Sequence, residues 1–372
     1  MKIPLSSPDI TEPEIEAVAA TLRSPQLSLG PRLIEFEAAF TQLTGVKHAV
    51  AVSSGTAGLH LAMLALGIHV GDEIIVPSFT FIAAANAIRY VGATPIFVDI
   101  DPLTLNLSPA AVEKAITSRT RAILAVHTFG VPADMSSLIS IAQRHNLTLI
   151  EDACEALGST INSKSIGSFG EIAIFAFYPN KQITTGEGGM VVTRNARLAA
   201  HMRSLQNQGR TSSDSWLQHT ELGYNYRLSE IACTLGIGQM RRLANILDRR
   251  EEIAQLYHQQ LASVAGLTLP IREIPGTRIS WFVYVVRLTA GFTIAHRDQI
   301  IHDLEQAGIG CGRYFAPIHL QQAYADLAPG APLPVTEFVA SRTIALPFFN
   351  RIGDSEIVTV CEALKEAMRR IP

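Results

Sequence analysis

Short apolar segments alternate with amphipathic ones along the first half of the chain. The apolar segments predict strands, and the intervening segments, with apolar residues three or four positions apart, predict helices. The expected strands are HAVAVSS, DEIIVPS, TPIFVDID, RAILAVHTFG and LTLIEDA, and the expected helices are TAGLHLAMLALG, TFIAAANAIRYVG, Pro109–Thr117 and Met135–His145. Because these strands are apolar on both faces, the pattern favours a mostly parallel sheet covered by helices.

The pattern changes after this alternation. AIFAFY and GGMVVT, with only a loop between them, are expected as neighbouring strands near the end of the same sheet. From Ser229 to about Ser263 apolar residues recur at helical spacing, which predicts a long helix, broken near Gly236–Gly238, that leads into a second unit. In that unit SWFVYVVRL is an expected strand, RDQIIHDLEQAG a helix ending at Gly308, and another helix follows Asp354.

Length and composition agree with two packed units. The chain has 372 residues, of which 48% are hydrophobic, and this is ample for a large buried core. We therefore predict an α/β protein. Its large domain, residues 1–245 with an N-terminal arm, has three layers around a mostly parallel sheet, and a smaller α+β domain follows over residues 246–372.

Charge and cysteine content narrow the class of protein. A net charge of −3 favours no nucleic-acid-binding face. The four cysteines are scattered without metal-ligand spacing, which is typical of reduced thiols in a cytoplasmic protein, and we expect no metal site. The segment MKIPLSSPDITEPEIEAVAATL lacks the apolar core of a signal peptide, and no apolar run approaches the roughly 20 residues that span a bilayer. We expect a cytoplasmic protein without a membrane or nucleic-acid partner.

Common catalytic motifs are absent, and one lysine stands out. The sequence has no GxGxxG, Walker A, HExxH or GxSxG motif, which weakens dehydrogenase, NTPase, metalloprotease and serine-hydrolase hypotheses. Among only six lysines, Lys181 alone follows an apolar strand and precedes a glycine cluster, in FYPNKQITTGEGG. A nucleophilic lysine needs partial desolvation and close approach to a ligand, which glycines permit. From the spacing alone, a lysine on a surface loop is an equally open interpretation.

Two carboxylates end an expected strand in LIEDACEALGS. Glu151 and Asp152 lie at the carboxyl end of that strand, the edge at which open parallel sheets bind ligands. A carboxylate in such a place is costly unless it meets a positive partner, and a protonated ring nitrogen is one such partner. An ordinary helix cap at Asp152 is the open alternative.

Two other strand ends carry groups that suit a phosphorylated aromatic ligand. In SSGTAGLHLAML, Gly55, Thr56 and Ala57 open a helix whose N-terminus can bind an anion, although a plain capped helix has the same pattern. In VPSFTFIAAANA, Phe79 or Phe81 can cover a flat ring or belong to the core. Together with the lysine and the carboxylates, these groups fit pyridoxal 5′-phosphate (PLP), with the lysine as its Schiff-base partner.

The same motifs resemble the DegT/DnrJ/EryC1/StrS family of sugar aminotransferases, within the aspartate-aminotransferase fold type I of PLP enzymes. The resemblance covers nearly the whole chain and includes SSGTAGLHLA, GDEIIVPSFTFIAAANAI, GATPIFVDID, VHTFGVPADM, IEDACEALGS, FYPNKQITTGEGGMVVT, LGYNYRLSEI and YFAPIHLQ, in this order. It implies an obligate homodimer with shared active sites. It also implies transfer of an amino group from L-glutamate to a keto group, at C4 in the perosamine-like branch, of a nucleotide-linked keto-deoxy sugar for amino-sugar and surface-polysaccharide biosynthesis.

The resemblance also implies roles for individual residues. Lys181 would carry PLP as the internal aldimine and shuttle the proton, and Asp152 would keep the pyridine nitrogen protonated. Glu155 stands where many relatives have Gln or His beside the cofactor's phenolic oxygen, so that glutamate or that oxygen would carry a proton. Ala176 stands where relatives often have serine, so one phosphate hydroxyl would be missing. The implied cofactor-binding residues are Gly55, Thr56, Ala57, Phe81, Asp152, Glu155, Lys181 and Asn225, the last reaching the phosphate of the neighbouring subunit.

The sugar-binding residues and the substrate class are less specific. Arg313, Tyr314 and His319, in GCGRYFAPIHLQ, are candidates for binding a diphosphate and sugar hydroxyls, and structural roles for them are equally open. Another fold-type-I PLP enzyme, acting on amino acids, is the alternative activity, because Arg278, Arg287 or Arg313 can clamp an α-carboxylate. A PLP-binding regulatory protein without turnover is the third hypothesis, and the combination of lysine, aspartate and phosphate cradle argues against it.

Overall fold

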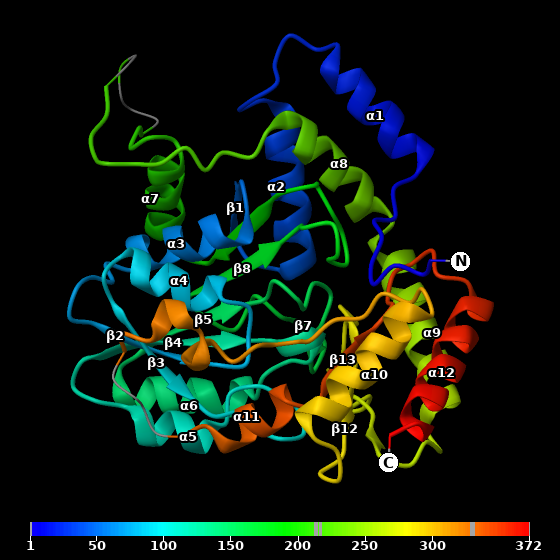
Figure 1. Ribbon diagram of the computed structural model, residues 1–372. Coiled ribbons are helices and arrows are strands. Elements are labelled where there is room, and N and C mark those ends of the chain that lie inside the picture. Colours follow the sequence, from blue (N-terminus) through cyan, green and yellow to red (C-terminus); the bar gives the residue numbers. More distant parts are fainter. Residues whose placement is uncertain (1, 212–214, 216–217, 328–331, 372) are drawn as a thin grey trace.

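The centre of the molecule is a mostly parallel sheet (Figure 1). The computed structural model describes residues 2–211, 215, 218–327 and 332–371. The sheet has the order β1-β9-β8-β5-β4-β2-β3, and within it β9 runs in the direction opposite to all the other strands. Its strands are β1 (His48–Val52), β2 (Glu73–Pro77), β3 (Thr94–Val98), β4 (Thr120–Val126), β5 (Thr148–Asp152), β8 (Ile172–Ala176) and β9 (Gly189–Thr193). The expected parallel sheet and the pairing of β8 with β9 are confirmed.

Helices cover both faces of this sheet, which gives three layers. Side chains alternate along each strand: Val50 and Val52 pack in the core beneath one layer of helices, and Ala49 and Ala51 pack in the core on the other face. The first layer holds α3 (Gly55–Ala65), α4 (Ala83–Tyr90) and α7 (Ala196–Gln206), and the second holds α2 (Pro31–Thr44), α5 (Pro109–Ala115), α6 (Met135–His145) and α8 (Glu230–Arg241). Both faces of the strands are therefore buried, as their apolar composition predicted.

The helix expected after Ser229 divides at Arg242, where α8 ends and α9 (Leu243–Leu261) begins. The predicted break at the glycines is wrong, because Gly236 and Gly238 lie inside α8. A β-carbon at Gly236 would lie 2.5 Å from the ring of Phe36 on α2, and one at Gly238 would lie 2.6 Å from the side chain of Glu14 on α1 (Glu12–Leu22). These glycines allow close helix packing and do not form a turn.

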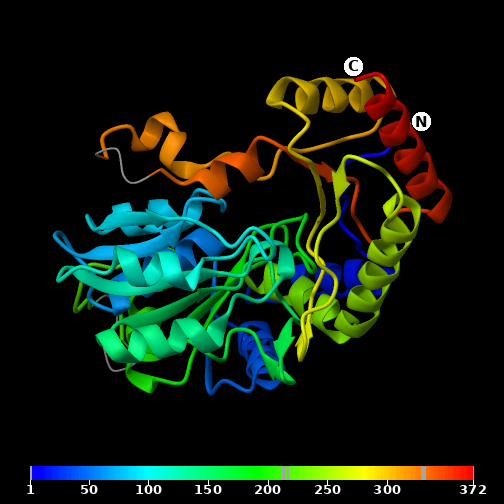
Figure 2. The same cartoon turned by 90° about the horizontal axis from the view of Figure 1, so that it is seen from below.

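A second unit packs beside the large sheet (Figure 2). Its antiparallel sheet, β10-β12-β13, shares an apolar core with α9, α10 and α12. A small sheet, β11-β6-β7, pairs a strand of the later sequence with a hairpin of the earlier one. The bounds are β6 (Thr160–Ile161), β7 (Lys164–Ser165), β10 (Leu267–Thr268), β11 (Thr277–Arg278), β12 (Tyr284–Leu288), α10 (Ile294–Gln306), α11 (Pro334–Ala340), β13 (Thr343–Leu346) and α12 (Asp354–Arg369). A domain boundary at residue 245 stays a prediction.

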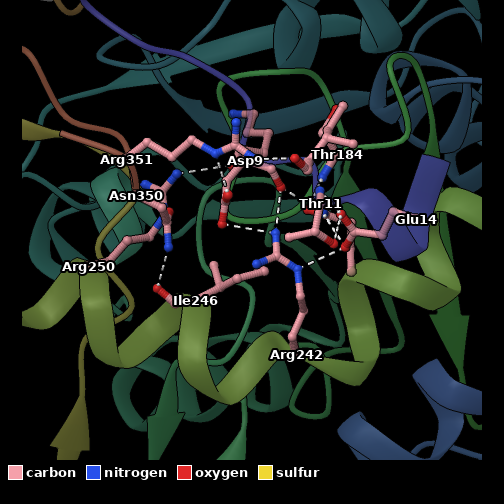
Figure 3. Close-up of polar contacts among 12 residues, drawn as sticks. Asp9, Thr11, Glu14, Thr184, Arg242, Ile246, Arg250, Asn350 and Arg351 are labelled. Atoms are coloured by element: carbon pink, nitrogen blue, oxygen red, sulfur yellow. Dashed lines mark hydrogen bonds and ion pairs between the residues drawn. The ribbon is translucent and has the colours of Figure 1, made fainter.

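The N-terminal segment joins the two units (Figure 3). The backbone of Ile3 forms hydrogen bonds with Gly308 and Gly310 of the second unit. Further along, the carboxylate of Asp9 lies 2.9 Å from Arg242, between α8 and α9, and 2.8 Å from Arg351, before α12. Among the described helices, none is long and apolar enough to cross a membrane.

Candidate active site

The carboxyl ends of the parallel strands open into a cavity of about 450 Å³. Loops after β1, β2, β4, β5 and β8 meet here, as expected for an open parallel sheet. The sequence-predicted residues that line it are Gly55, Thr56, Phe81, Asp152, Glu155, Lys181 and Tyr314, whereas Ala57, Asn225, Arg313 and His319 do not line it. A larger groove, about 920 Å³, lies between α2, α8 and the β6–β7 hairpin and contains none of these residues. Most of the residues that the sequence predicts for the site therefore lie around the smaller cavity.

Lys181 points into this cavity from the loop after β8. Its backbone N–H donates to the carbonyl of Tyr178 (2.9 Å), and its side chain is only 14% exposed. The Nζ atom lies 3.7 Å from the carboxylate of Glu155 and 3.9 Å from the centre of the Phe282 ring. The side chain is thus partly desolvated, with its amine between an acidic group and an aromatic face.

Glu155 is buried, and hydrogen bonds hold both its carboxylate and its backbone carbonyl. Its carboxylate accepts a hydrogen bond from the backbone N–H of Phe129 (2.8 Å), and its own carbonyl accepts one from the side chain of Gln182 (2.6 Å). Burial raises the pKa of Glu155, and the nearby charge of Lys181 and the Phe129 hydrogen bond only partly offset this effect. The site therefore favours a proton on Glu155 more than water does.

This raised pKa predicts a pH-dependent effect of Glu155→Gln. A carboxyl group whose folded-state pKa exceeds its unfolded value stabilises the fold below the unfolded pKa, and this contribution is lost as pH rises through the folded pKa. We expect the melting temperature of the cofactor-free variant to rise relative to wild type as pH increases above 4.5, the ordinary pKa of glutamate. Differential scanning fluorimetry between pH 4 and pH 8 measures this; a difference that is constant over this range would contradict it.

The adjacent residues Glu151 and Asp152 have different environments. Glu151 is fully buried and accepts hydrogen bonds from the backbone N–H groups of Gly167, Phe169 and Gly170 (2.6–2.9 Å), so it anchors a loop. Its burial favours protonation, but hydrogen bonds, first from His127, outweigh this and leave the pKa of Glu151 lowered. The two side chains separate because successive residues of a strand face opposite sides.

Asp152 faces the cavity without a cation. Its side chain contacts the backbone N–H of Cys154 (3.1 Å) and lies within hydrogen-bonding reach of the Cys154 thiol. Only 7% of Asp152 is exposed, and none of the described residues forms an ion pair with it. Burying a carboxylate in this way is costly unless a positive group completes the site. A protonated ring nitrogen fits this requirement.

The N-terminus of α3 forms another wall. Ser54 caps the helix: its hydroxyl oxygen accepts from the N–H of Ala57 (3.0 Å), so this predicted phosphate-binding amide is already bonded. The N–H groups of Gly55 and Thr56 have no acceptor within the described chain. A β-carbon at Gly55 would lie 2.8 Å from that of Ala176, so glycine permits this close approach. Two free amides at a helix N-terminus suit a phosphate.

Of the two candidate phenylalanines, only Phe81 is available to a ligand. Phe79 is fully buried, with its ring edge-on to Phe129 and Phe315. Phe81 lines the cavity and is 62% exposed, which is unusual for a phenylalanine and leaves a ring free to cover a flat ligand.

The three candidate sugar-binding residues occupy different places in the structure. Tyr314 lines the cavity, where burial raises the pKa of its hydroxyl and Asn180 lies within hydrogen-bonding reach. Arg313 instead pairs with Asp298 (2.9 Å). The ring of His319 lies between Ser78 (2.6 Å) and Glu337 (3.3 Å). In the described chain these last two side chains already have polar partners outside the cavity.

Several cavity residues were not predicted from the sequence. Phe282 and Phe315 come from the second unit, and Tyr178 and Asn180 lie within the three residues before the lysine. Position next to Lys181 could have identified Tyr178 and Asn180, whereas nothing in the local pattern places Phe282 against the lysine. Asn225 is exposed on the segment between α7 and α8, so its predicted contact with a second subunit stays a prediction.

Comparisons with known proteins show the family to which the chain belongs. The model of the DegT/DnrJ/EryC1/StrS aminotransferase family matches residues 8–365. GDP-perosamine synthase from Caulobacter vibrioides is 42% identical over 342 residues, 92% of this chain and 91% of the relative. The structure of S. venezuelae DesV with a ketimine intermediate is 36% identical, covers 100% of both chains and has a TM-score of 0.92. The PLP form of Spr1654 from Streptococcus pneumoniae is 28% identical, again covers 100% of both chains and has a TM-score of 0.95. The chain therefore belongs to the DegT/DnrJ/EryC1/StrS aminotransferase family and is a PLP-dependent aminotransferase.

Proposed function

We propose that the protein transfers an amino group from L-glutamate to the C4 keto group of a nucleotide-linked keto-deoxy sugar. The observation that carries this proposal is the meeting, in one cavity, of a partly desolvated lysine, a buried carboxylate without a cation, and two free helix amides. The substrate class is supported by the identity with GDP-perosamine synthase, a relative that matches nearly the whole chain. The product would be an amino sugar for surface-polysaccharide biosynthesis.

The cavity residues fit PLP by their chemistry. Bound PLP would supply an electron-accepting ring, which is the part of the reaction that protein side chains do not provide. Lys181 would attach the cofactor and, once its amine is free, move the substrate's proton. Asp152 would pair with the ring nitrogen, the amides of Gly55 and Thr56 would bind the phosphate, and Phe81 would cover the ring. A volume of about 450 Å³ is in the usual range for such a ligand site.

A homodimer with shared active sites is part of the proposal. Asn225 is exposed and lies outside the cavity of its own chain. An amide group in this position is available to a neighbouring copy, and the resemblance assigns it to that copy's phosphate. The proposed dimer would therefore complete the phosphate site with a residue that each chain supplies to the other.

The arginines considered for an amino-acid enzyme lie elsewhere. Arg278 pairs with Asp248, Arg287 donates to the carbonyl of Pro102, and Arg313 pairs with Asp298. None of the described residues lining the cavity is an arginine, so these three arginines do not face the cavity of their own chain. The proposed donor L-glutamate also carries an α-carboxylate, so the preference for sugar acceptors rests on the identity with GDP-perosamine synthase.

A coupled assay tests the proposal. Purified protein with PLP and L-glutamate would be incubated with nucleotide-linked 4-keto-6-deoxyhexoses, with guanosine, thymidine or uridine as the base, and separately with keto acids. We expect 2-oxoglutarate and an amino sugar from at least one keto sugar, with guanosine-linked sugars as the first candidates. Efficient turnover with keto acids alone would contradict the proposal and favour the amino-acid enzyme.

A further inference from the structure

Arg250 is a buried cation behind the candidate active site. It comes from α9, the helix that also carries Ile246 (Figure 3), and is only 3% exposed. None of the described carboxylates forms an ion pair with it. Asp9 is close enough to act on it electrostatically, but the oxygens of Asp9 contact Arg242 and Arg351. Burial lowers the pKa of Arg250 to about 10, so the guanidinium is charged at neutral pH.

The guanidinium binds backbone carbonyls from two distant segments. One terminal nitrogen donates to the carbonyls of Trp281 (3.2 Å) and Phe282 (3.0 Å), before β12. The other donates to the carbonyl of Lys181 (3.2 Å), after β8. Arg250 therefore links the backbone of the lysine to the backbone of the aromatic residue whose ring lies 3.9 Å from the lysine amine.

A purely structural role does not explain the choice of arginine well. A buried charge without an ionic partner is expensive, and an apolar side chain of similar volume is often neutral or stabilising in its place. The Nε atom of Arg250 has no hydrogen-bond partner in the described structure, which adds to the cost. What arginine provides is a rigid planar fork with several donors, which a single lysine ammonium cannot reproduce.

Gln182, the residue after Lys181, forms a second set of hydrogen bonds to the segment that contains Phe282. Gln182 donates to the carbonyl of Glu155 (2.6 Å) and reaches the carbonyl and hydroxyl of Ser280 (3.3 and 3.2 Å). Gln182 thus ties Glu155 to Ser280, and Arg250 ties Lys181 to Phe282. A lysine side chain carries its amine on a flexible four-carbon stem, so the position of the amine depends on the lysine backbone and on the residues around the side chain.

We propose that Arg250 is a positioning residue that fixes the amine of Lys181 against the ring of Phe282. The inference rests on the proposed role of Lys181 as the attachment point of PLP. With its backbone held relative to the ring, the amine keeps one location between Phe282 and Glu155, and an aldehyde entering the cavity meets it there. Without the Arg250 guanidinium, the segments that contain Lys181 and Phe282 can move apart, and the amine can occupy other positions.

Ring-current shifts in the cofactor-free protein test this geometry directly. Lysine amines would be dimethylated with ¹³C-formaldehyde and a borane reductant, and Lys181→Arg would identify the signal of Lys181 among the six lysines. Protons above an aromatic face resonate upfield, so we expect an upfield signal in wild type that Phe282→Leu abolishes. Arg250→Lys and Arg250→Met are expected to lose most of this displacement while remaining folded by circular dichroism.

Arg249→Lys is the matched control. Arg249 lies next to Arg250 on α9, but it faces outward and binds Asp354 and Glu252. We expect the control to leave the Lys181 signal unchanged. In the holoenzyme, Arg250→Lys is also expected to move the pH midpoint of the visible absorption band, which a loss of stability alone would not do.

The outcomes separate this inference from the function on which it rests. An unchanged Lys181 signal and an unchanged pH midpoint in a folded Arg250 variant would overturn the positioning role. Failure of both Arg250 variants to fold, with Arg249→Lys folded, would also overturn it, because Arg250 would then serve overall stability. If wild type with added PLP shows no visible band, the proposed function fails, and the signals of the cofactor-free protein still report the geometry.

Discussion

Replacing Lys181 with alanine is expected to remove the visible absorption band of the PLP-bound protein and to reduce turnover by at least 10²–10⁴-fold, the usual contribution of one acid–base group. The loss should be larger where attachment of the cofactor also fails, because one amine serves both purposes. The amine cannot be replaced from nearby, since the described residues lining the cavity include no other lysine. Absorption spectra before and after addition of L-glutamate measure the first effect, and steady-state rates measure the second.

An exposed lysine provides the control for this experiment. Lys47 lies on the surface before β1, away from the cavity, and Lys47→Ala is expected to keep the band and the rate. The spectrum of Lys181→Ala decides between two interpretations of the sequence. A variant that keeps the band and converts it with glutamate at the wild-type rate would show that another group binds the cofactor, and Lys181 would then be an ordinary buried lysine.

The parts of the site that follow strand ends were predictable from the sequence. Strands that are apolar on both faces predict a parallel sheet, and parallel strands end at one edge. Asp152 and Lys181 were therefore expected to lie near each other although they are 29 positions apart in the sequence. The glycine and threonine that open α3 belong to the same edge, and the structure brings all of them into the cavity.

The contributions of the second unit could not be predicted in the same way. The position of Phe282 against Lys181 depends on packing between segments a hundred residues apart, which no local periodicity contains. Arg313 and Tyr314 are adjacent in sequence, yet Arg313 pairs with Asp298 and only Tyr314 lines the cavity. Gly236 illustrates the same limit, because its role becomes visible only when Phe36 is packed against it.

Asp152→Asn is expected to affect function and stability in opposite directions. Losing a buried pair with the ring nitrogen costs about 3–5 kcal/mol, which is about 10²–10⁴-fold in PLP affinity or turnover. The cofactor-free protein should be as stable as wild type or more stable, because a buried carboxylate without a cation has been removed. Asparagine can still accept the hydrogen bond from Cys154, so the local turn is kept. Equilibrium PLP binding and urea unfolding measure the two effects.

Glu151→Gln is the matched control, one residue earlier on the same strand. Its carboxylate is the acceptor for three backbone N–H groups, so this change is expected to lower the free energy of unfolding by about 1–3 kcal/mol at neutral pH, with little effect on PLP affinity in the protein that remains folded. We therefore expect opposite results from the two variants: Asp152→Asn lowers PLP affinity without loss of stability, and Glu151→Gln lowers stability with little change in PLP affinity. If Asp152→Asn instead destabilises the cofactor-free protein and leaves PLP affinity unchanged, Asp152 only holds the turn after β5 through Cys154, and the partner of the ring nitrogen must be sought elsewhere. If both variants lose stability and affinity together, neither carboxylate acts on the cofactor independently of the fold.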